Sequence, residues 1–329
     1  MLPFTLSLGL AVEAARRLTG ADGRVELTNA RAHRWLTLDR GTLDVLLEAE
    51  RTPDGVVQIA LAGHEPDGRR YAAFGAAVAV DPQRHAPPPA ALPDPGRGPV
   101  GCTAHEFYHR FAFHGPSFQT LSRVEAIGPD VAVAVVRATA VPDMDVLTVG
   151  LDPAVLDAAG QLVAVWLLEH GHRDFGAYPF ALDRLTLFAP PVLPGNELRL
   201  VARVRRESAG WTEADLEFSD PAGRLVARLE GFRQRLVSFP VGFARLVQGG
   251  APDDEPGTAA LPEREFLTAN GGIWGQVLAH LALPPERLEE WYRTGRPLRP
   301  LEQWLDNRRP ASGAVGDRRP APRLAGSHS

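Results

Sequence analysis

The stretch PAVLDAAGQLVAVWLLEH at residues 153–170 decides the fold. It opens with a proline, which is favoured at the first position of a helix, and continues for about five helical turns with few polar side chains. A helix this apolar must be covered by other elements on most of its surface. Asp157 is therefore unexpected about one turn inside it. Either the helix is open to solvent at this point, or the acid is kept for chemistry.

A similar apolar helix pattern, again with an opening proline, occupies residues 3–18. The alternating strand patterns at 42–49 and 197–204 are 155 positions apart, and so are the turns EPDGR at 65–69 and DPAGR at 220–224. Chance rarely preserves one offset across both a strand and a turn. We therefore infer that the chain contains an internal duplication.

The economical way to cover two such helices is to wrap a curved antiparallel sheet around each of them. This arrangement is an α+β double hotdog fold. Strands are also expected ahead of the second helix, within 117–140, where Val131, Val133 and Val135 share a face. The expected domains are an N-terminal hotdog at 1–81 that lacks the counterpart of these leading strands, a Pro-rich linker at 82–100, a C-terminal hotdog at 101–240, and a helical tail with a disordered end at 241–329.

Composition narrows the class of protein. The chain has 329 residues, 44% of them hydrophobic, and a net charge of −5, which is enough for one large or two ordinary domains. All 35 basic residues are scattered arginines, so neither a nucleic acid nor a membrane surface is expected as a partner. The only cysteine, Cys102, excludes an internal disulfide. The N-terminus resembles neither a signal peptide nor a membrane span, so we expect a soluble cytoplasmic protein.

The residues around Asp157 allow two interpretations. Asp152 is suited to cap the helix before Pro153, and Gln161 follows Asp157 by four positions, which places both side chains on one face. A buried carboxyl there could donate a proton near neutral pH, because burial opposes its ionisation. The alternative is an ordinary Asp near the helix start that caps or solvates the helix.

Two motifs resemble those of polyketide synthase dehydratase domains. DPAVLDAAGQ at 152–161 is similar to the family's HPxxxDAxxQ motif, although Asp152 replaces its His. FHGPSFQTL at 113–121 resembles the YGPxFQGL segment, with His114 where Tyr is usual. LPFTLSLGLAVEAA at 2–15 is similar to the family's first central helix. The sequences of the FHGPSFQ and LPF segments most resemble those of iterative synthases of the enediyne and polyunsaturated fatty-acid type.

The resemblance implies dehydration of a β-hydroxyacyl thioester carried on acyl carrier protein. Asp157 would be the acid that protonates the departing hydroxyl, and Gln161 would orient it. The resemblance places five further residues along the substrate tunnel, namely His114, Gly115, Pro116, Phe118 and Pro3. It implies neither a metal nor a nucleotide cofactor, since the substrate is held on the carrier's phosphopantetheine arm. Expected partners are acyl carrier protein and other synthase domains, and a homodimer is left open.

One departure from the family pattern concerns the base. In the family, the His of an HxxxGxxxxP motif removes the α-proton, and Pro3 matches the final Pro, so this His would precede Met1. Three explanations are open: a start assigned too late, a segment of a longer synthase, or a decayed gene. We therefore keep two alternatives, a non-catalytic hotdog module that binds acyl chains or scaffolds a synthase, and an acyl thioester hydrolase. His105 and His109 are expected at the surface or along the tunnel, not as metal ligands.

Overall fold

The computed structural model describes residues 2–238 except for short segments at 22, 35, 37–43, 65–67, 82, 84–85, 94–97, 113, 140–151, 173–174, 189–191 and 209. Three predicted features fall wholly or partly outside the described residues: the helical tail at 241–329, the start of the strand pattern at 42–49, and most of the turn at 65–69.

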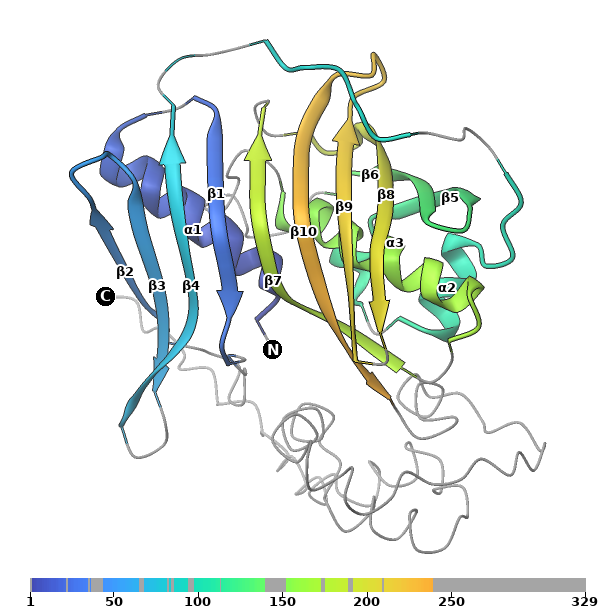
Figure 1. Ribbon diagram of the computed structural model, residues 1–329, viewed down its shortest axis with the longest axis horizontal. Helices are drawn as coiled ribbons and strands as arrows, with labels where there is room; N and C mark the ends of the chain where they lie inside the picture. The colour runs from blue at the N-terminus through green and yellow to red at the C-terminus, as the bar shows by residue number, and fades with distance from the viewer. Residues whose placement is uncertain are drawn as a thin grey trace, which may run out of the picture.

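Two long helices, α1 (Phe4–Thr19) and α3 (Pro153–Glu169), lie against the same face of a curved sheet (Figure 1). Both are found within one residue of their predicted bounds. The prediction for Pro3 was wrong in one respect: it is the N-cap of α1 and not its first helical residue, because its ψ of 144° is extended. The helix α1 ends where Gly20 adopts a left-handed conformation with φ of 67°, which glycine does without steric cost.

The ten strands in the described part of the chain form one antiparallel sheet in the order β2-β3-β4-β1-β7-β10-β9-β8-β6-β5. Each helix is followed by four strands with the same relative order, so the duplication and the double hotdog prediction are confirmed. The strands of the two halves form one continuous sheet because β1 of the first half pairs with β7 of the second. The strands are β1 (Val25–Ala32), β2 (Leu46–Arg51), β3 (Val57–His64), β4 (Arg70–Val80), β5 (Leu121–Ile127), β6 (Val131–Arg137), β7 (Phe175–Leu187), β8 (Glu197–Ser208), β9 (Trp211–Ser219) and β10 (Leu225–Ser238).

The helix α3 is the centre of the second half, and almost every residue on it is buried. Leu162 and Leu167 are fully buried within the core shared by both halves. Burying a leucine side chain contributes roughly 1.5–3 kcal/mol, which explains why so apolar a helix is stable only inside a sheet. No helix in the described part of the chain is long and apolar enough to cross a membrane.

The N-terminal ends of α1 and α3 approach each other closely. A Cβ added to Gly9 of α1 would lie 3.2 Å from Cγ of Pro153, the first residue of α3. The lack of a side chain at Gly9 therefore lets the two helices meet near their N-termini. This contact brings the first turn of α3 beside the N-terminal half of α1.

Strands β5 and β6 precede α3, as predicted, and both faces of β6 are covered. Ala132, Ala134 and Val136 face the main core, whereas Val133 packs on the opposite face with Val201 of β8. Part of the Pro-rich linker covers this second face, where Leu92 packs against the Val133 cluster.

Glu217 of β9 attaches the linker to the sheet. Its Oε2 accepts hydrogen bonds from the backbone N–H groups of Ala91 at 2.7 Å and Leu92 at 2.8 Å, and its Oε1 accepts from Arg228. The side chain of Glu217 is buried, and a buried carboxylate is stable only when its oxygens are paired in this way. The linker is therefore bound along the second half.

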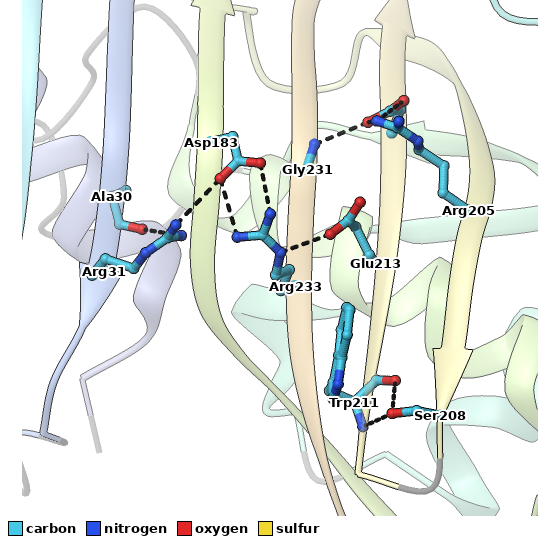
Figure 2. Close-up of polar contacts among 10 residues, drawn as sticks. Ala30, Arg31, Asp183, Arg205, Ser208, Trp211, Glu213, Gly231 and Arg233 are labelled. Atoms are coloured by element: carbon cyan, nitrogen blue, oxygen red, sulfur yellow. Dashed lines mark hydrogen bonds and ion pairs between the residues drawn. The ribbon is translucent and has the colours of Figure 1, made fainter.

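An ion-pair network crosses the junction between the two halves (Figure 2). Asp183 of β7 accepts from Arg31 of β1 at 3.3 Å and from Arg233 of β10 at 2.7 Å, and Arg233 also donates to Glu213 of β9. Gly231 lies on β10, two residues before Arg233. Its φ is 63°, and it falls at a register shift between β9 and β10. Such an irregularity increases the local bend of the strand, which suits a sheet that wraps around helices.

Candidate active site

Asp157 lies on α3 near the end where the two helices meet. The helix begins as predicted, since the Asp152 side chain caps it by accepting from Ala154 N–H at 2.8 Å and Pro153 is the first helical residue. Burial raises the pKa of Asp152, although this hydrogen bond acts in the opposite direction. Only 12% of the Asp157 side chain is exposed, so it is not an ordinary solvated Asp.

Three side chains from separate segments converge on the carboxylate of Asp157. Thr5 of α1 places its hydroxyl 3.4 Å from Oδ1. Gln161 donates from Nε2 to Oδ2 at 2.9 Å, and Nε2 of His114 lies 3.1 Å from the same oxygen. The Thr5 contact belongs to the first half of the molecule and the other two to the second half. Asp157 of α3 therefore faces α1, the corresponding helix of the first half.

Gln161 is buried and all of its hydrogen-bonding groups are used. Its Oε1 accepts from the Tyr108 hydroxyl at 2.5 Å, and its Nε2 donates both to Asp157 and to the Phe118 carbonyl at 2.8 Å. Tyr108 in turn accepts from Leu121 N–H at 2.8 Å. Because a backbone N–H can only donate, the phenol hydrogen is left for Gln161. This direction fixes the amide with its NH₂ group toward Asp157.

Tyr108 belongs to the short helix α2 (Ala104–Arg110), which starts with a capping box between Thr103 and Glu106. Burial raises the pKa of the Tyr108 phenol, and the charge of Asp157 adds to the effect. The phenol is therefore neutral at physiological pH and can serve as a permanent hydrogen-bond donor.

The GPSF segment forms a tight turn beside α3. Gly115 is the N-cap and Pro116 the first residue of the 3-10 helix η1 (Pro116–Phe118). Its last residue, Phe118, contributes the carbonyl that binds Gln161. Pro3 joins the site only through α1, where Thr5 follows two residues later. The assignment of these residues to a substrate tunnel stays a prediction.

Sequence reasoning missed Thr5 and Tyr108. A signal for Thr5 was present, because Thr5 and Ser7 are polar residues at the start of an apolar helix, and both are buried. Tyr108 gave no comparable signal, since its role depends on the fold bringing α2 against α3. Within the described ranges, no three His, Cys, Asp or Glu side chains are grouped so that they could hold a metal ion.

Comparison with known proteins shows what the second half is similar to. Residues 84–241 match the family model described as the polyketide synthase dehydratase N-terminal domain. This segment is therefore similar to polyketide synthase dehydratase domains. The match begins in the linker and covers the C-terminal hotdog, including the Asp157 motif and the GPSF segment.

Individual proteins similar to this chain point to the same family. Polyketide synthase GfsE of Streptomyces halstedii is 37% identical over 138 residues, which is 42% of this chain but only 3% of that protein. The dehydratase domain of RzxB from Pseudomonas fluorescens is 19% identical, with a TM-score of 0.55 over 67% of this chain and 80% of that one. A trans-AT polyketide synthase dehydratase domain from Brevibacillus brevis is 16% identical, with a TM-score of 0.59 over 72% and 86%. At these identities, the two structures show a shared fold.

Proposed function

We propose that this chain dehydrates a β-hydroxyacyl thioester carried on acyl carrier protein during polyketide or fatty-acid-like chain assembly. The observation that supports the proposal most directly is the position of Asp157. Its carboxyl lies where the second half faces α1 of the first half, and the amide of Gln161 is oriented toward it. An elimination needs an acid and a base on opposite sides of one substrate, which two facing pseudo-repeats can provide.

In the proposed reaction, Asp157 transfers a proton to the β-hydroxyl as it leaves, and Gln161 holds the resulting carboxylate. The N-terminal end of α3 carries a partial positive charge, which favours the negative carboxylate after proton transfer. Removal of the α-proton falls to a base that the resemblance assigns to a His of the first hotdog. A general acid of this kind contributes about a hundredfold to ten-thousandfold in rate.

The proposal also includes the carrier of the substrate, the partner domains, the absence of a cofactor and the location of the protein. The substrate is held by the phosphopantetheine arm of an acyl carrier protein, and other synthase domains extend the chain before and after this step. The elimination involves no electron transfer and needs neither a metal nor a nucleotide. We place the protein in the cytoplasm, where these partners would meet it.

The test is an assay of β-hydroxyacyl thioesters on acyl carrier protein, with detection of the enoyl product by absorbance and mass spectrometry. The 329-residue chain and a version extended by any in-frame upstream coding sequence should be measured together. Asp157→Asn should lower kcat by about a hundredfold or more with little change in thermal stability. Asp130→Asn is the matched control, because Asp130 is exposed and pairs with Arg203 far from the site.

The outcomes separate the proposal from its alternatives. Enoyl product that depends on Asp157 supports dehydration. Release of the free acid without an enoyl product would favour a thioester hydrolase, and binding of the acyl chain without turnover in both versions would favour a non-catalytic module. Full activity of Asp157→Asn would remove this carboxyl from the mechanism.

A further inference from the structure

The side chain of His114 is directed at the carboxylate of Asp157. Its Nε2 lies 3.1 Å from Oδ2, and the two side chains are 21% and 12% exposed. The backbone that carries His114 is held in place, because Gln119 donates from Nε2 to the His114 carbonyl at 2.8 Å. Its Nδ1 is buried. The ring nitrogen that can exchange a proton at the site is therefore the one that faces Asp157.

The hydrogen bonds around Asp157 show which form of the carboxyl the site favours. Gln161 can only donate through Nε2, and its hydrogen bonds with the Tyr108 hydroxyl and the Phe118 carbonyl prevent its amide from turning around. The hydroxyl of Thr5 can donate to the other oxygen. An ionised carboxylate accepts all of these contacts, including a proton held on Nε2 of His114. The distance between Nε2 and Oδ2 is that of a hydrogen bond, so a proton on Nε2 would point at the carboxylate.

We infer that His114 and Asp157 share one proton and deliver it as a pair to the departing β-hydroxyl. This inference rests on the proposed dehydration. As the imidazole base of the first hotdog takes the α-proton, the electrons of the C–H bond form the Cα=Cβ double bond. The Cβ–O bond breaks with its electrons on oxygen, which takes the shared proton and leaves as water. The pair is left as neutral imidazole and carboxylate, and it is reprotonated before the next turnover.

The proposed sharing of a proton depends on a histidine, and not a tyrosine, at position 114. An imidazole ordinarily exchanges its proton near neutral pH, whereas a free carboxylic acid has lost its own at a lower pH. A phenol, which dehydratases usually have at this position, keeps its proton until about pH 10 and cannot share it in this way. Among the described residues, two other titratable groups belong to this region: Tyr108 on α2 and Asp152 at the start of α3, and burial raises the pKa of each.

Two substitutions of His114 test the inference by kinetics. His114→Gln keeps a hydrogen-bond donor but carries no exchangeable proton, and kcat should fall by about a hundredfold or more with little change in KM. His114→Tyr restores the residue usual in the family. Its acid would then be Asp157 alone, without the imidazole proton, so kcat should again fall below the wild-type value. His64→Gln is the matched control, since His64 is an exposed residue at the end of β3.

A second measurement does not depend on turnover. Proton NMR of the wild-type chain should show a signal far downfield of the amide region, from the N–H between His114 and Asp157. The signal should disappear in both His114→Gln and Asp157→Asn. Its absence from the wild type, or a His114→Tyr variant with the wild-type rate, overturns the inference. If the signal behaves as expected but no enoyl product forms, the proposed dehydration is rejected while the proton-sharing pair stands.

Discussion

The phenol of Tyr108 donates to Oε1 of Gln161 at 2.5 Å, and this contact, together with the hydrogen bond from Nε2 to the Phe118 carbonyl, determines which end of the amide faces Asp157. The two residues are 53 positions apart and belong to α2 and α3. A chain of hydrogen bonds therefore leads to Asp157. Leu121 N–H of β5 donates to the Tyr108 hydroxyl, which donates to Gln161, and Gln161 donates to Asp157.

Tyr108→Phe should lower activity without unfolding the protein. Without the hydroxyl, Oε1 of Gln161 loses its donor and Leu121 N–H loses its acceptor, so the amide is held less firmly toward Asp157. The net value of one such hydrogen bond is about 1 kcal/mol, so we expect kcat to fall roughly fivefold to tenfold. Tyr71→Phe is the matched control, because the ring of Tyr71 lies beneath Arg34 and phenylalanine preserves that contact. An unchanged kcat in Tyr108→Phe would show that Gln161 needs no orientation from α2.

Asp152→Asn should change the pH dependence of stability. The folded-state pKa of Asp152 is raised above 3.8, mainly by burial. A group with a raised pKa contributes stability at low pH and loses it as pH rises through its folded value. Asparagine keeps the N-cap without a charge. The free energy of unfolding of the variant, relative to wild type, should therefore increase as pH rises from about 3.8 through the acidic range, as measured by urea unfolding.

Asp220→Asn is the control for this experiment because its sign is opposite. Burial alone would raise the pKa of Asp220, but the hydrogen bonds and charge of Arg224 lower it overall. The wild-type carboxylate is therefore stabilising above its unfolded value of 3.8 and loses that effect as pH falls through its folded value. Relative to wild type, Asp220→Asn should become less stable as pH rises. The same slope in both variants would contradict this account.

Glu217→Gln should loosen the linker. One carboxylate oxygen would become an NH₂ group, which must then face either the N–H groups of Ala91 and Leu92 or the guanidinium of Arg228. A buried donor left without its partner costs about 1–3 kcal/mol. We expect a lower melting temperature and faster hydrogen exchange at Ala91 and Leu92. Glu230→Gln, on an exposed ion pair with Arg184, should leave both unchanged.

Gly231→Ala should destabilise the junction between the halves. A Cβ at Gly231 would lie 2.2 Å from Oδ2 of Asp183, so Asp183 would have to move away from Arg233. Gly223→Ala separates this clash from the backbone effect, since Gly223 also has a positive φ but has open space around it. The left-handed conformation costs alanine about 1–2 kcal/mol at either position. Equal losses in denaturant unfolding would mean that the contact with Asp183 is unimportant.

The sequence by itself determined the duplicated architecture. The helices at 3–18 and 153–170 are too apolar for a surface, and the strand and turn patterns recur at one offset, so a curved sheet around each helix was the consistent solution. It also determined the pairing of Asp157 with Gln161 and the cap at Asp152. These features depend on residues a few positions apart, whose relative placement helix geometry sets directly.

Tertiary structure alone decided what surrounds Asp157. Thr5 is 152 positions away from it, and Tyr108 is 53 positions from Gln161. His114 was expected along a tunnel, but its contact with Asp157 was not foreseen. Contacts over such distances depend on how helices and strands pack, which local periodicity does not encode. The pairing of β1 with β7 was likewise decided only by the tertiary structure. The pattern of a strand shows which of its faces is buried but not which strand lies beside it.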